Sequence, residues 1–404
     1  MEAEQTTLLV IALGAFVVPL LSGRIGVPAA VGEIAFGLLV GPYVTGAVAS
    51  TEFFDFLAEF GFAFLMFLAG LELDFANLER RGGRMLVVSC IVAGLVVGLA
   101  FLAAWSMGWP PFFGIIVGAM SIGIMLVALR ETGDARSDFG QTLIISGSVG
   151  ECLAILIFTL YGIASRDGFG LTFVAESLKL LGVFLAAYVV LRTLRLLVWW
   201  FPSQFSRMVK VEDPSEIGIR AGLALMIGFF AISESLGMEA ILGTFLAGAL
   251  FSFVFREKGI LETKLAGLGH GFLIPVFFIH VGVSLNLDQL DREILPLVAQ
   301  LLALILLVRL VACLPLFAMG FRLRQIAGGA LLLATPLTLL VAIAALGLEL
   351  GVLNAREVAT VILTAAISGL IFPTAFRRLV RRTPGEGDAA AGAALPAAES
   401  SARS

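Results

Sequence analysis

The chain has 404 residues, of which 59% are hydrophobic and only 14% are charged, and its mean hydropathy is +1.04. Soluble proteins are about 45–50% apolar and about 25% charged, so this composition excludes a soluble enzyme. The net charge is −4 and the basic residues are scattered through short loops, which excludes a nucleic-acid-binding protein.

Apolar stretches that are long enough to cross a bilayer core of about 30 Å as helices recur along the chain. The predicted spans, in chain order, are 6–23, 27–48, 53–72, 85–106, 110–129, 142–163, 172–200, 216–236, 238–255, 270–285, 294–319, 328–347 and 357–376. The first span has no positively charged leader before it, so we expect a retained helix rather than a signal peptide. The sequence therefore predicts an all-α, polytopic membrane protein with about thirteen transmembrane helices.

Lys and Arg accumulate in the cytoplasmic loops of membrane proteins. With the N-terminus outside, nineteen of them fall in inner loops, and only four fall outside, namely Arg166, Lys179, Arg292 and Arg356. We therefore expect the C-terminus in the cytoplasm, where residues 383–404 are too poor in large apolar side chains to fold and form a disordered tail. The absence of a targeting signal is compatible with a bacterial plasma (inner) membrane.

The three cysteines lie inside apolar segments and lack metal-binding spacing, so we expect no disulfide, no zinc site and no cofactor.

Two stretches of the chain resemble two later ones. The run GVPAAVGEIAFGLL, at 26–39, matches GMEAILGTFLAGAL, at 237–250, and the run from Phe62 matches the run from Ile274. The matched glycines are Gly26/Gly237, Gly32/Gly243, Gly37/Gly248 and Gly70/Gly282. The paired helices are seven spans apart, and an odd step turns the second copy upside down in the membrane.

We therefore predict a membrane transport domain over 1–382 that is built from two inverted six-helix repeats, about 6–163 and 216–376, with 172–200 as a linker helix. The alternative is chance similarity, because glycines in membrane helices also serve ordinary close packing.

Two helices in corresponding places of this repeat show signs of a break. One contains GAMSIG, at 118–123, and the other contains ATPLT, at 334–338. Proline cannot donate the helical hydrogen bond and disfavours helix in the residue before it. Unwound backbone at membrane depth is stable where it lines a cavity, and its half-helix ends can face an ion. The pairing favours an ion site over two unrelated kinks.

A charge at the bilayer centre costs about 2.5–3.5 kcal/mol on insertion scales, so each one needs an explanation. Glu151 lies in the middle of 142–163. Burial disfavours the charged form of a carboxylate, so this group is suited to hold a proton and a cation in turn, although a structural, ion-paired glutamate is the alternative. Arg309 lies deep in 294–319 and must pair with a carboxylate, such as Glu151 or Glu234, or with backbone carbonyls.

Three further polar residues are secondary candidates. Glu33 and Glu234 lie nearer helix ends, where a structural or cavity-lining role is the simpler interpretation. His280 has the side chain that titrates near neutral pH, but a packed neutral histidine is the simpler interpretation. Glu72 and Asp74 close the third span and are expected to be solvated.

Several motifs in order along the chain resemble the monovalent cation:proton antiporter superfamily, in particular the branch with bacterial sodium/proton exchangers and potassium efflux systems. These motifs are VGEIAFGLLVGP (31–42), FLAGLELD (67–74), LRE (129–131), LGTFLAG (242–248) and PVFFIHVG (275–282). The resemblance implies a homodimer with a dimerisation domain and a mobile core domain, two crossed broken helices at the ion site and an elevator-like cycle. It also places Glu151 at the family's ion-binding acid and Arg309 at its core-domain lysine.

The chain departs from the family pattern at the site itself. The family's pair of a polar residue and an acid is here Gly150-Glu151, and its Ser-Ser-Thr at the first break is here Met120-Ser121-Ile122. A single carboxylate favours electroneutral exchange of one proton for one cation.

The sequence thus predicts an antiporter for Na⁺ or K⁺ and H⁺ that binds both at Glu151, with no other metal site. Ser121, Thr335, Thr338 and the backbone around them complete the cation shell, and Arg309 stabilises the empty carboxylate. Two alternatives stay open: an ion-coupled symporter of an organic solute with the same fold, and a membrane sensor that transports nothing.

Overall fold

The computed structural model of the chain describes residues 2–25, 27–48, 51–72, 83–168, 170–200, 216–235, 240–254, 259–285 and 294–380, and within these residues the regular secondary structure is helical. The predicted tail at 383–404 lies outside these residues, as do the matched glycines Gly26 and Gly237 and the acid Asp74. Each of the thirteen predicted spans coincides with one helix or with a pair of consecutive helices.

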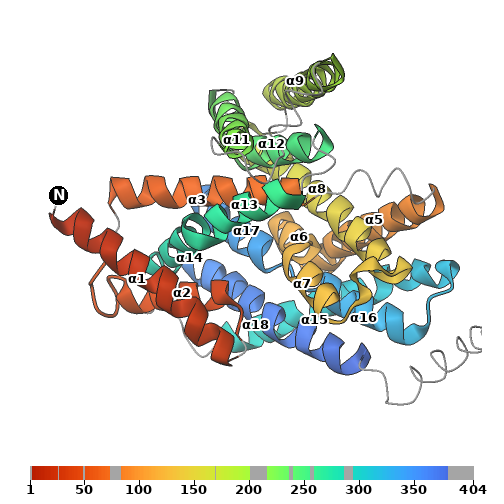
Figure 1. Ribbon diagram of the computed structural model, residues 1–404. Coiled ribbons are helices and arrows are strands. Elements are labelled where there is room, and N and C mark those ends of the chain that lie inside the picture. Colours follow the sequence, from red (N-terminus) through yellow and green to blue (C-terminus); the bar gives the residue numbers. More distant parts are fainter. Residues whose placement is uncertain are drawn as a thin grey trace, which may run out of the picture.

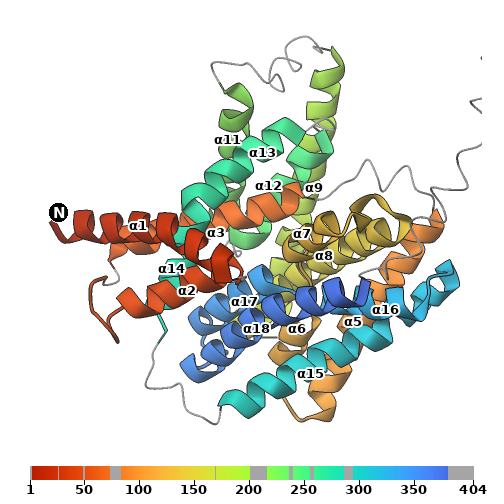
Figure 2. The ribbon, with the colours of Figure 1, turned by 60° about the horizontal axis from the view of Figure 1, so that its bottom comes forward.

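The helices pack in two groups, which Figure 2 shows beside each other. The first group consists of α1 (Glu2–Ile25), α2 (Ala29–Val40), α3 (Glu52–Leu71), α11 (Ile217–Ser235), α12 (Ala240–Val254), α13 (Gly259–Leu268) and α14 (Ile274–Val283). The second group consists of α5 (Gly83–Ser106), α6 (Pro111–Gly118), α7 (Gly123–Glu131), α8 (Asp138–Asp167), α15 (Ile294–Ala312), α16 (Leu323–Leu333), α17 (Leu337–Glu349) and α18 (Ala355–Val380). The long helix α9 (Leu171–Trp200) contacts α8 of one group and α12 of the other (Figure 1).

Length and hydropathy make most of these helices suitable for a bilayer. Within the described residues, ten helical segments are long and apolar enough to cross a membrane, and two shorter apolar helices, Ala29–Val40 and Leu242–Phe253, accompany them. The chain is therefore a multi-pass helical membrane protein, whereas the total of thirteen spans stays a prediction.

Two predicted boundaries were wrong. The span predicted over 27–48 ends as a helix at Val40, because Gly41 and Pro42 follow and the residue before a proline disfavours helix. The span predicted to begin at 270 begins eleven residues earlier, at Gly259, and passes through a π-helical turn, Gly269–Leu273, before α14. Charged and glycine residues in α13 lower its hydropathy, which is why the sequence pattern missed it.

Glycines bring two pairs of helices of the first group into backbone contact. On α2, a Cβ atom added to Gly37 would lie 2.0 Å from the carbonyl oxygen of Ile279 in α14, and one added to Gly282 in α14 would lie 2.1 Å from the oxygen of Ile34. Any side chain at these positions would overlap the neighbouring helix, so only glycine permits this crossing.

The crossing of α3 and α12 has the same construction. A Cβ atom on Gly70 would lie 2.0 Å from the oxygen of Phe245, and one on Gly248 would lie 1.9 Å from the oxygen of Phe67. Gly37 and Gly248 occupy equivalent places in the predicted repeat, as do Gly70 and Gly282, so the two crossings are related by the exchange of the two repeats. The inverted repeat stays a prediction that this reciprocity supports.

Candidate functional site

The first broken span lies in the second group. Pro111 begins α6 at a position where proline costs no hydrogen bond, and the helix ends at Gly118 because Ala119 adopts an extended conformation with ψ 132°. The backbone becomes helical again at Gly123, the first residue of α7. The residues between, Ala119 to Ile122, are all buried, so this interruption lies inside the protein.

The second broken span has the predicted proline at its centre. The helix α16 ends at Leu333, and α17 begins at Leu337 directly after Pro336. Thr335 is buried, and its hydroxyl donates a 2.6 Å hydrogen bond to the carbonyl of Leu332, one of the acceptors freed by the break. This bond uses the hydroxyl proton of Thr335 and leaves the lone pairs of its oxygen as acceptors.

The two interruptions meet in space. The hydroxyl oxygens of Ser121 and Thr338 lie 2.9 Å apart and share a hydrogen bond between segments that are 217 residues apart in the chain. Ser121 lies two residues before the start of α7 and Thr338 lies in the first turn of α17, so the beginnings of both second half-helices lie together at this point. The structure thus brings together two of the predicted site residues.

Arg309 joins the ends of the two first half-helices. It is fully buried in α15, and its guanidinium donates to Val117 O and Ala119 O at the end of α6, and to Leu333 O at the end of α16. A fourth bond, 3.1 Å long, goes to the carbonyl of Ile305 in its own helix. Helix C-termini carry about half a negative charge each, so this cation compensates both.

Backbone carbonyls, rather than an acid, are therefore the partners of Arg309. Of the two carboxylates that the sequence offered, Glu151 is not among its acceptors, and Glu234 lies exposed near the end of α11, in the other group of helices. A planar guanidinium has five N–H donors and no acceptor, which is why one side chain can serve three separate backbone segments.

Glu151 faces the other end of the crossing. Its side chain is 1% exposed in α8, and the hydroxyl of Ser121 and the backbone of Ile122 are its hydrogen-bonding neighbours at the start of α7. Its Oε2 atom is buried and has no hydrogen-bond partner. Buried polar atoms without a partner are rare and call for a ligand, a proton or a water molecule, so this oxygen is the candidate binding position.

The charges of Glu151 and Arg309 are opposite in sign to the partial charges of the helix ends that they face. The acid lies at a helix start, where the partial charge is positive, and the base lies at two helix ends, where it is negative. Ser121 thus links Thr338 and Glu151 at the beginnings of the second half-helices, while Arg309 binds the ends of the first half-helices. Oxygen ligands of this type suit hard monovalent cations and protons.

Glu72 was predicted to be solvated, and its side chain is partly exposed in the structure. It follows the last residue of α3, is half-buried, and is an electrostatic neighbour of Glu151. The helix α3 belongs to the first group, whereas Glu151 lies in α8 of the second group. No sequence spacing relates positions 72 and 151, which is why the pattern did not reveal this proximity.

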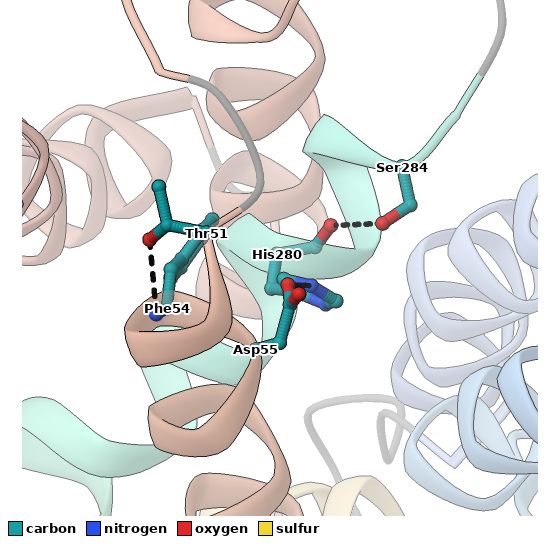
Figure 3. Close-up of polar contacts among 5 residues, drawn as sticks. All are labelled: Thr51, Phe54, Asp55, His280 and Ser284. Carbon is teal, nitrogen blue, oxygen red and sulfur yellow. Dashed lines mark hydrogen bonds and ion pairs between the residues drawn. The ribbon is translucent and has the colours of Figure 1, made fainter.

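The secondary candidates lie away from the crossing, on helices of the first group. Glu33 is buried in α2. His280 in α14 pairs with Asp55 of α3, with 2.9 Å between Nε2 and Oδ1 (Figure 3). The ring of Phe54 packs edge-on against the imidazole at 4.9 Å. His280 thus joins two helices at a partly exposed position.

Comparisons with known proteins agree with the fold. The family described as "Sodium/hydrogen exchanger, transmembrane" matches residues 11–382. The putative Na(+)/H(+) antiporter YjbQ of Bacillus subtilis is 29% identical over 94% of this chain, which spans only 64% of the length of that relative. The Na(+)/H(+)-K(+) antiporter GerN of Bacillus cereus is 26% identical over 72% of this chain and 74% of its own.

A solved structure has the same fold. The sodium proton antiporter MjNhaP1 from Methanocaldococcus jannaschii, determined at pH 8, matches 93% of this chain and 96% of its own with a TM-score of 0.64 at 14% sequence identity.

Proposed function

Because the chain belongs to the sodium/hydrogen exchanger family, we propose that it is a secondary active antiporter that exchanges a monovalent cation, Na⁺ or K⁺, for H⁺ across a membrane. The family is one of transporters rather than enzymes. The observation that carries the proposal is the unbonded, buried Oε2 atom of Glu151 at the meeting point of two broken helices. An oxygen in this position gains a partner when either a cation or a proton binds.

The single carboxylate gives the exchange its stoichiometry. A proton and a cation compete for Glu151, so each loaded form is neutral and the empty, charged form is disfavoured in a buried site. One H⁺ then crosses in one direction for each monovalent cation that crosses in the other, and the exchange moves no net charge. The hydroxyls of Ser121 and Thr338, with nearby carbonyls, complete the cation shell.

The two groups of helices provide a route to alternating access. The ion site lies within the group of α5–α8 and α15–α18, and Arg309 ties three of its backbone segments into one unit. We propose that this group moves against the glycine-packed group of α1–α3 and α11–α14, which forms the contact between two copies in a homodimer. The orientation with the N-terminus outside a bacterial inner membrane belongs to the same proposal.

The names of the relatives are compatible with either Na⁺ or K⁺ as the exchanged cation. YjbQ is named for Na⁺ and H⁺, and GerN is named for Na⁺, H⁺ and K⁺.

The test is exchange in liposomes. Purified protein is reconstituted in vesicles with an acid interior and a trapped pH dye, and Na⁺, K⁺ or Li⁺ is added outside. We expect alkalinisation of the interior that depends on the cation and is lost in Glu151→Gln, which keeps the size of the side chain but cannot ionise. The matched control is Glu33→Gln, because Glu33 is also buried but lies in α2.

Full exchange in Glu151→Gln would contradict the proposal. If folded wild-type protein exchanges none of the cations, uptake of Na⁺ that requires an added organic solute would support the symporter alternative, and no flux under any condition would support the sensor.

A further inference from the structure

Met120 occupies the space beside the acid of the ion site. A Cβ atom added to Gly150, the residue before Glu151, would lie 1.7 Å from the methyl carbon of Met120 and 2.8 Å from its sulfur. The side chain of Met120 therefore lies directly over α8 where position 150 has no side chain. Met120 is fully buried and is linked by one peptide bond to Ser121, the hydrogen-bonding neighbour of Glu151.

This contact gives the pocket one apolar wall. Ser121 and Thr338 present oxygens to the site, whereas Met120 presents a thioether and a methyl group, which bind water and hard cations weakly. A methionine in this place prevents water or a further ligand from approaching Glu151 over Gly150. The number of ligands and the room around a cation decide which cation a site prefers.

We infer that Met120 is a specificity-determining residue that limits the size of the cation, or the number of water molecules it retains, at Glu151. The inference rests on the proposed function, since it concerns the same site. Gly150 is required for this arrangement, because any side chain at position 150 would overlap the side chain of Met120.

Shortening Met120 opens space over Gly150, the residue before Glu151. A cavity holds water only if it is roomy enough and offers polar partners. In Met120→Ala the Oε2 atom of Glu151, which has no partner in the wild type, becomes such a partner. A cation that needs more room or more ligands, such as K⁺, then gains relative to Na⁺.

The experiment measures the half-saturating concentrations of Na⁺ and K⁺ for wild type, Met120→Ala, Gly150→Ala and the double variant. Removing a few atoms from a binding pocket changes discrimination about tenfold or more. We expect Met120→Ala to lower the value for K⁺ relative to that for Na⁺ by about this factor. In the double variant the methyl group of residue 150 refills part of the opened space, so the ratio returns toward the wild-type value.

The matched control is Met226→Ala, because Met226 is equally buried but lies in α11, in the other group of helices. The measurements are made by vesicle exchange and by the rise in thermal unfolding midpoint that each cation causes in the purified protein, which reports binding without turnover. Met120→Leu, which keeps an apolar side chain but not its length, provides an intermediate case if the alanine variant folds poorly.

The inference is overturned if the ratio of the two cations changes no more in Met120→Ala and Met120→Leu than in Met226→Ala, or if the effects of Met120→Ala and Gly150→Ala simply add. Failure of the proposed function looks different, because wild-type protein would then exchange no cation. In that event the thermal measurement alone decides the role of Met120, and a wild-type protein that no cation stabilises overturns the inference as well.

Discussion

The two groups of helices each contain helices that cross at close range, and they achieve this in opposite ways. In the first group, α2 crosses α14 and α3 crosses α12 as continuous helices, and glycines remove the side chains that would separate them. In the second group, both spans are interrupted, and they meet through a hydrogen bond between the hydroxyls of Ser121, in the first interruption, and Thr338, in the first turn of α17. The crossings in the first group lack side chains at the point of contact, whereas the spans in the second group lack helical hydrogen bonds there.

The difference explains where the chemistry lies. A continuous helix satisfies its own backbone groups, so the glycine crossings have nothing left to offer a ligand and serve as a rigid contact. The broken helices leave carbonyls and N–H groups free at the centre of the protein, where they must find partners. Arg309 and Glu151 supply partners of opposite charge, and the proposed cation site is at the second of them.

The largest effect should come from removing the guanidinium from the broken crossing. In Arg309→Ala, the carbonyls at the ends of α6 and α16 lose their donor in a buried place, and we expect a loss of about 3–5 kcal/mol in stability together with loss of exchange. Arg309→Lys should recover part of the stability, because an ammonium group provides charge but not the planar fork that reaches both helix ends. The thermal unfolding midpoint in detergent measures both variants.

Arg84→Ala is the control for this experiment. The guanidinium of Arg84 also donates to a backbone carbonyl, that of Ala318 at 2.5 Å, but at an exposed position. If Arg309→Ala is no less stable than Arg84→Ala, the view that Arg309 holds the two half-helices together is wrong.

The sequence predicted the interruptions but not how they are joined. Pro336 and the glycines at 118 and 123 have strong local effects on the backbone, so both breaks could be located from the sequence, as could Glu151 from its place in an apolar span. The particular acceptors of Arg309 could not, because two of them, Val117 and Ala119, lie 192 and 190 residues away and backbone carbonyls have no sequence signature.

Contacts between residues that are far apart in the chain could not be predicted from the sequence either. The contact of Met120 with Gly150 depends on how the interruption between α6 and α7 lies against α8, and the pairing of His280 with Asp55 depends on the register of α3 against α14. A hydropathy pattern specifies which residues lie in the membrane and which positions carry charge. It does not specify rotation about the helix axis, which decides these contacts.

A smaller effect is expected from adding a methyl group to a continuous crossing. In Gly248→Ala, the new Cβ atom would lie 1.9 Å from the carbonyl oxygen of Phe67, and backbone cannot give way as a flexible side chain can. We expect α3 and α12 to separate, at a cost of about 1–3 kcal/mol in stability. The unfolding midpoint of the purified protein measures the cost.

The control is Gly94→Ala, because Gly94 lies in α5 and nothing would touch its added Cβ within 4 Å. That change should be neutral or slightly stabilising, since alanine favours helix over glycine. Gly37→Ala, at the equivalent place of the predicted repeat, should cost about as much as Gly248→Ala. Equal stability of the Gly94 and Gly248 variants would show that the crossing does not require glycine.

The smallest effect should come from the ion pair between His280 and Asp55, although it also joins two helices of the first group (Figure 3). Its two side chains are 25% and 50% exposed, and exposed ion pairs contribute about 0.2–1 kcal/mol because solvent weakens them. We expect Asp55→Asn to lower the unfolding midpoint less than Gly248→Ala does and to leave cation exchange unchanged. A loss of exchange comparable to that of Glu151→Gln would instead show that transport requires this ion pair. The glycine crossings alone would then not be enough to hold the first group rigid while the ion site moves.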